Sequence, residues 1–165
     1  MVDRPKLLIA TGNAGKLREL SSLLRDVPYK LVSPDDVGVS DDVEETGATY
    51  EANARIKATA YSRMSGLPTL ADDSGLEVEA LNGDPGVRSA RYAGAGAGDS
   101  ERIAYLLQKL DNKKAGGSAR FCCVIAVAWP EGTVEVHDGE VRGEITRTPR
   151  GQNGFGYDPI FIVEG

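Results

Sequence analysis

The chain has 165 residues, of which 41% are hydrophobic and 27% are charged, and its formal net charge is −6. This length and balance predict one globular domain, residues 1–165, with a core of its own. The negative charge argues against a long nucleic acid as a partner, because its phosphates would be repelled. No apolar run approaches transmembrane length, and no signal peptide is evident, so we expect a cytoplasmic protein that does not bind membranes.

The cysteine and histidine content argues against several kinds of site. Cys122 and Cys123 are adjacent within an apolar run, and on a strand they would point to opposite faces. We therefore expect buried, reduced thiols rather than a disulfide. His137 is the only histidine, which weakens any mechanism based on a Ser–His or Cys–His pair and any zinc site.

The first half of the chain alternates between short apolar runs and helical patterns. Hydrophobic residues from Leu17 onward recur at the spacing of one helix face, and Asp26 and Pro28 end that pattern. The other elements expected in this half are a strand at Lys6–Ala10, a strand at Leu31–Ser33, an acidic loop at Asp35–Thr46, a helix at Thr49–Met64 and a strand at Thr69–Ala71.

The second half contains the most apolar run of the chain and more turn signals. The run from Arg120 to Trp129 predicts a central strand, and the alternation from Thr133 to Ile145 around Asp138-Gly139 predicts a hairpin. A turn-rich loop is expected at Asn82–Gly86, a flexible stretch at Ala93–Gly98, a helix from Asp99 or Ser100 to Leu110, and a last strand at Ile160–Val163. This order predicts an α/β domain with a mixed sheet and flanking helices, with two lobes around a central nucleotide cleft.

A glycine loop with a lysine lies between the first strand and the first helix. Amides at the start of a helix lack partners within the helix and can bind an anion. Two glycines would let the backbone approach a phosphate, and the lysine would add a positive charge, although the spacing is not that of a Walker loop. An ordinary strand-to-helix turn with a solvated lysine is the alternative. The side chain of Asn13 could bond either to its own turn or to a ligand. The loop consists of Thr11, Gly12, Asn13, Ala14, Gly15 and Lys16.

A pair of acids, Asp72 and Asp73, follows the strand expected at Thr69–Ala71. Ligands of open α/β sheets bind beyond the carboxyl ends of the strands, so these carboxylates would lie where a ligand binds. A divalent cation would relieve their repulsion, and Mg²⁺ suits carboxylates combined with substrate phosphates. Such a site could activate a water for attack on phosphorus. The alternative is a solvated turn in which one acid caps backbone amides.

Two further segments could assist these loops. Asn53 and Lys57 are four residues apart, so they share one helix face, from which the lysine could reach a phosphate or pair with Glu45 or Glu51. The late loop Gln152–Pro159 is too rich in glycine for regular structure. Its Phe155 could stack on a base, or its aromatic residues could simply close the core. Its Asp158 could form a hydrogen bond to a base edge or support the loop.

These segments together resemble the inosine/xanthosine triphosphate pyrophosphatase family, whose members hydrolyse non-canonical purine nucleoside triphosphates. The resemblance runs from about Lys6 to Phe161. The matching segments, in order, are Thr11–Lys16, Glu44–Gly47, Glu51–Ala54 with Lys57, Ala71–Leu76, Pro85–Tyr92 and Gly154–Pro159.

The resemblance implies a two-lobed α/β fold, a homodimer and a Mg²⁺-dependent reaction. ITP, dITP or XTP would be converted to the monophosphate and pyrophosphate. It implies that Asp73 is the proton acceptor and a metal ligand, that Glu44 contributes to the metal site and that Ser74 contacts the substrate. It also implies that Lys57 assists Thr11–Lys16 in holding the triphosphate, and that Phe155, Gly156, Tyr157 and Asp158 form part of the base pocket, with Phe155 stacked on the purine.

One family feature lies outside the match. Members of the family continue past the strand that ends near Val163, with a segment that helps to read the base, whereas the last residue of this sequence is Gly165. We therefore expect a single pyrophosphatase domain that lacks this segment. Two alternatives stay open: a Maf-like nucleotide pyrophosphatase with another base preference, and a module that binds a nucleotide without hydrolysing it.

Overall fold

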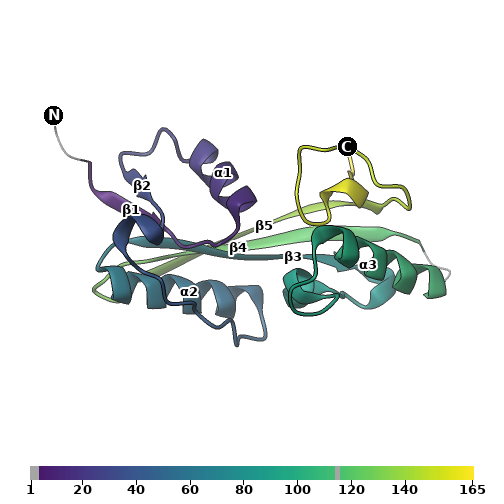
Figure 1. Ribbon diagram of the computed structural model, residues 1–165, viewed down its shortest axis with the longest axis horizontal. Helices are drawn as coiled ribbons and strands as arrows, with labels where there is room; N and C mark the ends of the chain where they lie inside the picture. The colour runs from purple at the N-terminus through teal and green to yellow at the C-terminus, as the bar shows by residue number, and fades with distance from the viewer. Residues whose placement is uncertain (1–3, 114–115) are drawn as a thin grey trace. The chain divides into compact units, whose positions relative to one another are not determined.

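The computed structural model describes residues 4–113 and 116–165, and in this part of the chain six strands form one sheet flanked by helices (Figure 1). The sheet order is β2-β1-β3-β4-β5-β6. The strands are β1 (Lys6–Ile9), β2 (Lys30–Val32), β3 (Thr69–Val78), β4 (Ser118–Ala128), β5 (Val134–Ile145) and β6 (Phe161–Val163). The α-helices are α1 (Ala14–Leu23), α2 (Tyr50–Ser65) and α3 (Asp99–Lys113), and short 3-10 helices are η1 (Asp35–Val37), η2 (Glu79–Leu81), η3 (Gly86–Arg91) and η4 (Asp158–Ile160).

The sheet is mixed, as the sequence predicted. The first strand, β1, pairs in parallel with β2, where Leu8 is opposite Val32, and in parallel with β3, where Ile9 is opposite Leu70. The last strand, β6, pairs antiparallel with β5. Parallel neighbours require crossover connections, and the chain supplies them with α1 after β1 and α2 before β3. The prediction of an α/β domain with flanking helices is therefore confirmed.

The predicted hairpin around Asp138-Gly139 is wrong, because β5 runs through both residues without turning. The turn lies earlier, between β4 and β5, where the Trp129 amide donates to the Thr133 carbonyl at 2.9 Å. Gly132 has a φ of +104°, the left-handed conformation that glycine adopts without steric cost. The Asp-Gly signal was misleading because strand pairing, rather than the local dipeptide, decides where the chain reverses.

The strand expected at Thr69–Ala71 is longer than predicted, and Asp72 and Asp73 lie within it rather than after it. The neighbouring strand β4 has 11 residues and supports the extension of β3 across the acidic pair. Pairing with a long neighbour outweighs the low strand preference of aspartate. Both acids are consequently buried, with 4% and 6% of their surface exposed.

The chain divides into two compact units, in agreement with the two expected lobes. The first unit comprises the chain up to Asp73 together with Val124–Asp138, and the second comprises Ser74–Cys123 together with Gly139–Gly165. The long strands β3, β4 and β5 contribute residues to both units. The predicted nucleotide cleft stays a prediction.

In the first unit, α1 and α2 cover opposite faces of the strands (Figure 1). Large residues of β1 and β3, such as Ile9 and Leu70, pack with leucines of α1. The other face is built from small side chains: Ala54 and Ala58 of α2 pack with Ala71 of β3 and alanines of β4. Alanine-to-alanine packing lets α2 lie close to the sheet, so that even a short side chain on this helix can reach β3.

The core of the second unit is formed by β3, α3 and the C-terminal strands. Leu106 and Leu110 of α3 are fully buried against Leu76 and Val78 of β3. Phe121 and Phe161 add an edge-to-face ring contact with centroids 4.7 Å apart. The C-terminal end of the chain is tied into this core through Ile160, which is fully buried.

The cysteines differ from the prediction in one respect. No disulfide joins Cys122 and Cys123, as expected, but both are partly exposed rather than buried. Among the residues described, none of the helices combines the length and the apolar character needed to cross a bilayer.

The alanine-lined face of α2 generates a stability prediction. We expect Ala58→Leu to lower the free energy of unfolding by about 1–3 kcal/mol, because the added carbons have no space at a fully buried site. The matched change Ala60→Leu, on the same helix at a partly exposed position, should cost less than about 0.5 kcal/mol. Urea unfolding of both variants checks this, and equal effects would show that α2 does not pack closely there.

Candidate active site

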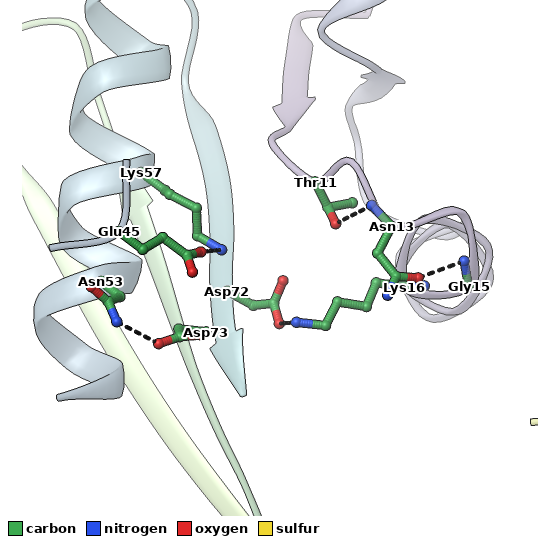
Figure 2. A network of polar contacts seen from close by, with 9 residues as sticks. All are labelled: Thr11, Asn13, Gly15, Lys16, Glu45, Asn53, Lys57, Asp72 and Asp73. Carbon is green, nitrogen blue, oxygen red and sulfur yellow. Dashed lines mark hydrogen bonds and ion pairs between the residues drawn. The ribbon is translucent and has the colours of Figure 1, made fainter. Parts of the chain in front are cut away.

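The alternation of side chains along β3 sends the two adjacent acids to opposite faces of the sheet (Figure 2). Asp72 shares a face with Leu70 and lies toward α1, whereas Asp73 shares a face with Ala71 and lies toward α2. The two carboxylates therefore do not form the side-by-side pair that the sequence suggested. Each has its own basic or polar partner from a different helix.

Asp72 is paired with the lysine of the glycine loop. Lys16 Nζ lies 2.6 Å from Oδ2 of Asp72, and the side chains are 22% and 6% exposed respectively. The other carboxylate oxygen, Oδ1, is buried and has no hydrogen-bond partner among the described residues. An unsatisfied buried carboxylate oxygen is costly, which makes it a candidate for a contact with a ligand or an ordered water.

The glycine loop is ordered by Asn13, which caps α1. Its Oδ1 accepts hydrogen bonds from the amides of Gly15 at 2.8 Å and Lys16 at 3.1 Å, and the Asn13 amide donates to Thr11 Oγ1 at 3.1 Å. This cap makes α1 begin at Ala14, three residues before the predicted start. Of the two alternatives for Asn13, the structure shows the bond to its own turn. A phosphate that used the Gly15 and Lys16 amides would have to displace this carboxamide.

Helix α2 positions the residues that face Asp73. It starts with Thr49 as its cap and ends at Gly66, which has a left-handed conformation, so its limits agree with the predicted helix to within one or two residues. Asn53 is fully buried and donates from Nδ2 to Oδ2 of Asp73 at 3.0 Å. One turn later, Lys57 Nζ lies 2.5 Å from Glu45 Oε1. Of the two acids considered as partners of Lys57, the structure therefore selects Glu45.

Several surrounding groups act on Asp73. Burial raises the pKa of its carboxyl above the ordinary value and is the largest effect, the hydrogen bond from Asn53 lowers it, and the negative charge of Glu45 raises it. The positive charges of Lys57 and Lys16 lower the pKa of Asp73 to a smaller extent. A carboxylate whose pKa is raised by burial is a better proton acceptor than an exposed one, and such groups gather at catalytic sites.

The acidic loop contributes Glu45 rather than Glu44 to this network. Glu45 is half-buried, pairs with Lys57 and acts electrostatically on Asp73, whereas the neighbouring Glu44 is exposed. The loop is fixed two residues later, where the Gly47 amide donates to Asn53 Oδ1 at 2.7 Å. The role of Glu44 as a metal ligand stays a prediction.

The charges of this network are suited to a divalent cation. Three carboxylates (Glu45, Asp72, Asp73) are accompanied by two ammonium groups (Lys16, Lys57), which leaves an excess of negative charge that would repel a triphosphate. Residues 4–113 and 116–165 contain no cluster of three or more metal-ligating side chains. The negative charge of Glu45 acts on the Asp73 carboxyl. Mg²⁺ is often bound by one or two carboxylates, with substrate phosphates and waters completing its shell. The donor set fits a metal shared with a substrate.

The late loop belongs to the second unit and is held by bonds of its own. The Phe155 amide donates to Asp158 Oδ2 at 3.0 Å, and the Gly156 amide donates to Asp99 Oδ2 at 2.8 Å. Tyr157 is buried and donates its hydroxyl hydrogen to the Ser89 carbonyl at 2.8 Å, and burial raises the pKa of this phenol. The aromatic residues thus have different positions, because Tyr157 is part of the core whereas Phe155 is only half-buried.

Gly154 and Asp158 explain why this loop needs its glycine residues. A side chain at Gly154 would collide with the Asp158 carboxylate, and Gly156 has a φ of +60°. Asp158 therefore supports the loop, which is one of the two roles considered for it. The segment is also more regular than predicted, since η4 begins at Asp158.

The structure brings part of the predicted set together. In the first unit, Lys16 and Asp72 form one pair, while Lys57, Glu45 and Asn53 gather near Asp73. Ser74, the next residue of β3, is half-buried. Three contributions were missed: the bond of Asn53 to Asp73, the role of Asp99 as an acceptor for the late loop, and that of Ser89 beneath Tyr157. Only the first had a signal in the sequence, namely an asparagine on the helix face that carries Lys57.

Comparison with known proteins gives consistent matches over nearly the whole chain. A dITP/XTP pyrophosphatase of Deinococcus deserti is 49% identical over 160 residues, which span 97% of this chain and 74% of that protein. One of Parasynechococcus marenigrum is 52% identical over 158 residues, spanning 95% of this chain and 77% of that protein. The solved structure of a HAM1 protein from Coxiella burnetii superimposes with a TM-score of 0.86 at 46% identity, covering 95% of this chain and 81% of that one.

The sequence profile of the Ham1 family matches residues 7–165. This range includes all of β1 except Lys6, the glycine loop, the acidic pair and the late loop. Together with relatives at about half identity, it shows that the chain belongs to the Ham1 family.

Proposed function

We propose that this chain hydrolyses non-canonical purine nucleoside triphosphates, namely dITP, ITP and XTP, to the monophosphate and pyrophosphate. The observation that carries the proposal is the buried Asp73, which is flanked by Glu45 and two lysines in a member of the Ham1 family. The names of its relatives, dITP/XTP pyrophosphatases at 49% and 52% identity, support the base preference.

In the proposed reaction, Asp73 accepts a proton from the attacking water. The water oxygen forms a bond to the α-phosphorus, the bond from that phosphorus to the bridging oxygen breaks, and pyrophosphate leaves. The raised pKa of Asp73 supports this role, since a general base works best when its pKa approaches the working pH.

The two lysines are proposed to bind the triphosphate. Each ammonium is held by a carboxylate, Lys16 by Asp72 and Lys57 by Glu45, so each is preorganised at a partly buried position. The glycine loop would contact the phosphates through its backbone amides and the Thr11 hydroxyl; the residues concerned are Thr11, Gly12, Asn13, Ala14 and Gly15. Where a phosphate needs the amides of Gly15 and Lys16, the Asn13 side chain would have to release them. Binding groups that are already in place lose less entropy when the substrate arrives.

We propose Mg²⁺ as the metal, with Asp73 and Glu45 as its protein ligands. The metal would supply charge neutralisation for the phosphates and polarise the attacking water. Glu45 is preferred to Glu44, because it is the acid whose charge acts on Asp73.

The base is proposed to be read by the late loop, with Ser74 as a further substrate contact. Phe155 is the half-buried aromatic residue of this loop and would stack on the purine, while Gly156, Tyr157 and Asp158 would shape the pocket. The homodimer, the cytoplasmic location and the absence of nucleic-acid and membrane partners stay predictions.

The central prediction of this function concerns Asp73. We expect the chain to release pyrophosphate from ITP, dITP and XTP faster than from ATP, with Mg²⁺ required and EDTA inhibitory. Asp73→Asn should lower kcat by about 100-fold or more, because the amide cannot accept the proton. Asp26→Asn, at a residue whose side chain is 91% exposed, is the matched control and should behave as the parent.

Three results would contradict the proposed function, each in a different way. An Asp73→Asn chain with the parental kcat would remove Asp73 from the reaction. Tight ITP binding without pyrophosphate release by the parent would favour a non-hydrolysing module, and a preference for dTTP or UTP would favour a Maf-like specificity.

The two neighbouring glutamates provide a matched test of the metal site. Glu45→Gln should raise the Mg²⁺ concentration needed for half-maximal activity by about tenfold or more, because a carboxylate ligand is lost. Glu44→Gln removes the same charge from an exposed position and should leave this concentration unchanged. Magnesium titrations of both variants provide the measurement. The opposite pattern would assign the metal site to Glu44, as the sequence resemblance first suggested.

A further inference from the structure

The most informative buried polar group outside the proposed reacting set is the carboxamide of Asn53. The side chain is fully buried on α2, and the structure gives it a partner at each end. Its Nδ2 donates to Oδ2 of Asp73 at 3.0 Å, and its Oδ1 accepts from the Gly47 amide at 2.7 Å. One carboxamide thus connects Asp73 to the loop that carries Glu45 (Figure 2 shows its contact with Asp73).

The orientation of this carboxamide is determined by its chemistry. A backbone N–H can only donate, so the end of Asn53 that faces Gly47 must be the oxygen. The NH₂ group must then face Asp73, and the Asp73 oxygen that receives it must be an acceptor without a proton. The bond is therefore directed, and rotation of the amide by half a turn would place two donors against each other on one side and two acceptors on the other.

The space around Gly47 strengthens this arrangement. A side chain added at Gly47 would place its Cβ 2.7 Å from both Ala52 Cβ and Asn53 Oδ1, and 3.0 Å from the Asn53 amide nitrogen. The loop backbone thus lies directly on the first turn of α2, at a distance that only glycine permits. The close packing of α2 on the sheet through Ala54 and Ala58 brings the short Asn53 side chain within reach of β3.

We propose that Asn53 is a positioning residue that holds Oδ2 of Asp73 by a hydrogen bond and, through the Gly47 amide, holds the loop that carries Glu45. The inference rests on the proposed role of Asp73 as the base. Asn53 does not contact the reacting atoms itself. It keeps the Asp73 carboxylate in one rotamer, and through Gly47 it sets the spacing between Asp73 and Glu45.

A change at Asn53 should act on the chemical step. Without the Nδ2 donor the Asp73 carboxylate can turn away from its position, and without the Oδ1 acceptor the Gly47 amide no longer holds the loop that carries Glu45. Neither bond involves Lys16 or Lys57, the proposed triphosphate contacts, so substrate binding should be kept. The expected effect is therefore a loss of kcat with little change of KM.

The test uses Asn53→Asp, which keeps an acceptor for the Gly47 amide but presents an oxygen to Asp73. We expect kcat for ITP to fall by about tenfold or more while KM changes by less than about threefold, because a group that orients a reacting side chain acts on the transition state rather than on substrate binding. Amide hydrogen exchange reports the second bond: the Gly47 amide should be protected in the parent and in Asn53→Asp, but not in Asn53→Leu, which lacks the acceptor.

Ser62→Ala provides the matched structural control. Ser62 is a buried polar residue of the same helix, and its hydroxyl donates to the Leu67 carbonyl at 2.8 Å, at the opposite end of α2 from Asn53. Its substitution should lower the melting temperature while leaving kcat, KM and the protection of the Gly47 amide in place. A merely structural role for Asn53 would give the same pattern as Ser62→Ala.

The outcomes separate this inference from the proposed function. A parent that releases no pyrophosphate from any nucleotide would overturn the function, and exchange of the Gly47 amide would then still test whether Asn53 holds the loop. Asn53→Asp with the parental kcat in an active protein would overturn the inference. If Asn53→Asp does not fold, Asn53→Leu removes the donor without adding a charge, and the same loss of kcat with little change of KM is expected.

Discussion

The alternation of side chains along β3 is the constraint on which the proposed site depends. Because neighbouring residues of a strand point to opposite faces, Asp72 and Asp73 meet different helices and acquire different partners. Asp72 holds a lysine from α1, and Asp73 is held by an asparagine from α2. A single dipeptide thus supplies both faces of the sheet, and a shift of β3 by one residue would exchange the two roles.

This constraint works only because the two helices are placed by different kinds of packing. Leucines of α1 lie on Ile9 and Leu70, whereas α2 uses alanines against the other face. The lysine of α1 is long enough to extend to Asp72, while Asn53 is short and requires the close approach that alanine permits. The packing of α1 and α2 in the first unit therefore determines which side chains reach the two acids.

Much of this could be predicted from the sequence. The fold class, the limits of α2 and the family followed from hydrophobic spacing and the order of six short motifs. The end of β3 and the turn before β5 could not be predicted, because both depend on pairing with a neighbouring strand rather than on local residues. The bond between Asn53 and Asp73 was also missed, because it joins residues 20 positions apart in the sequence.

The roles of Asn13 and of the Glu44–Glu45 pair could be decided only from the folded geometry. Asn13 was left between two roles because an asparagine can cap its own helix or contact a ligand, and only the folded geometry shows that the cap is formed. The glutamate pair posed a similar problem. Glu44 and Glu45 are indistinguishable by type, and their exposure, set by the docking of Gly47 on Asn53, separates them.

The most direct measurement is a side-by-side comparison of kcat and KM for Asp72→Asn and Asp73→Asn with dITP in Mg²⁺. The account predicts that Asp73→Asn loses kcat, because it removes the proton acceptor, whereas Asp72→Asn retains most of its kcat and changes KM through Lys16. Equal losses of kcat in the two variants would contradict it, because they would mean that the adjacent acids act together at one face of the sheet.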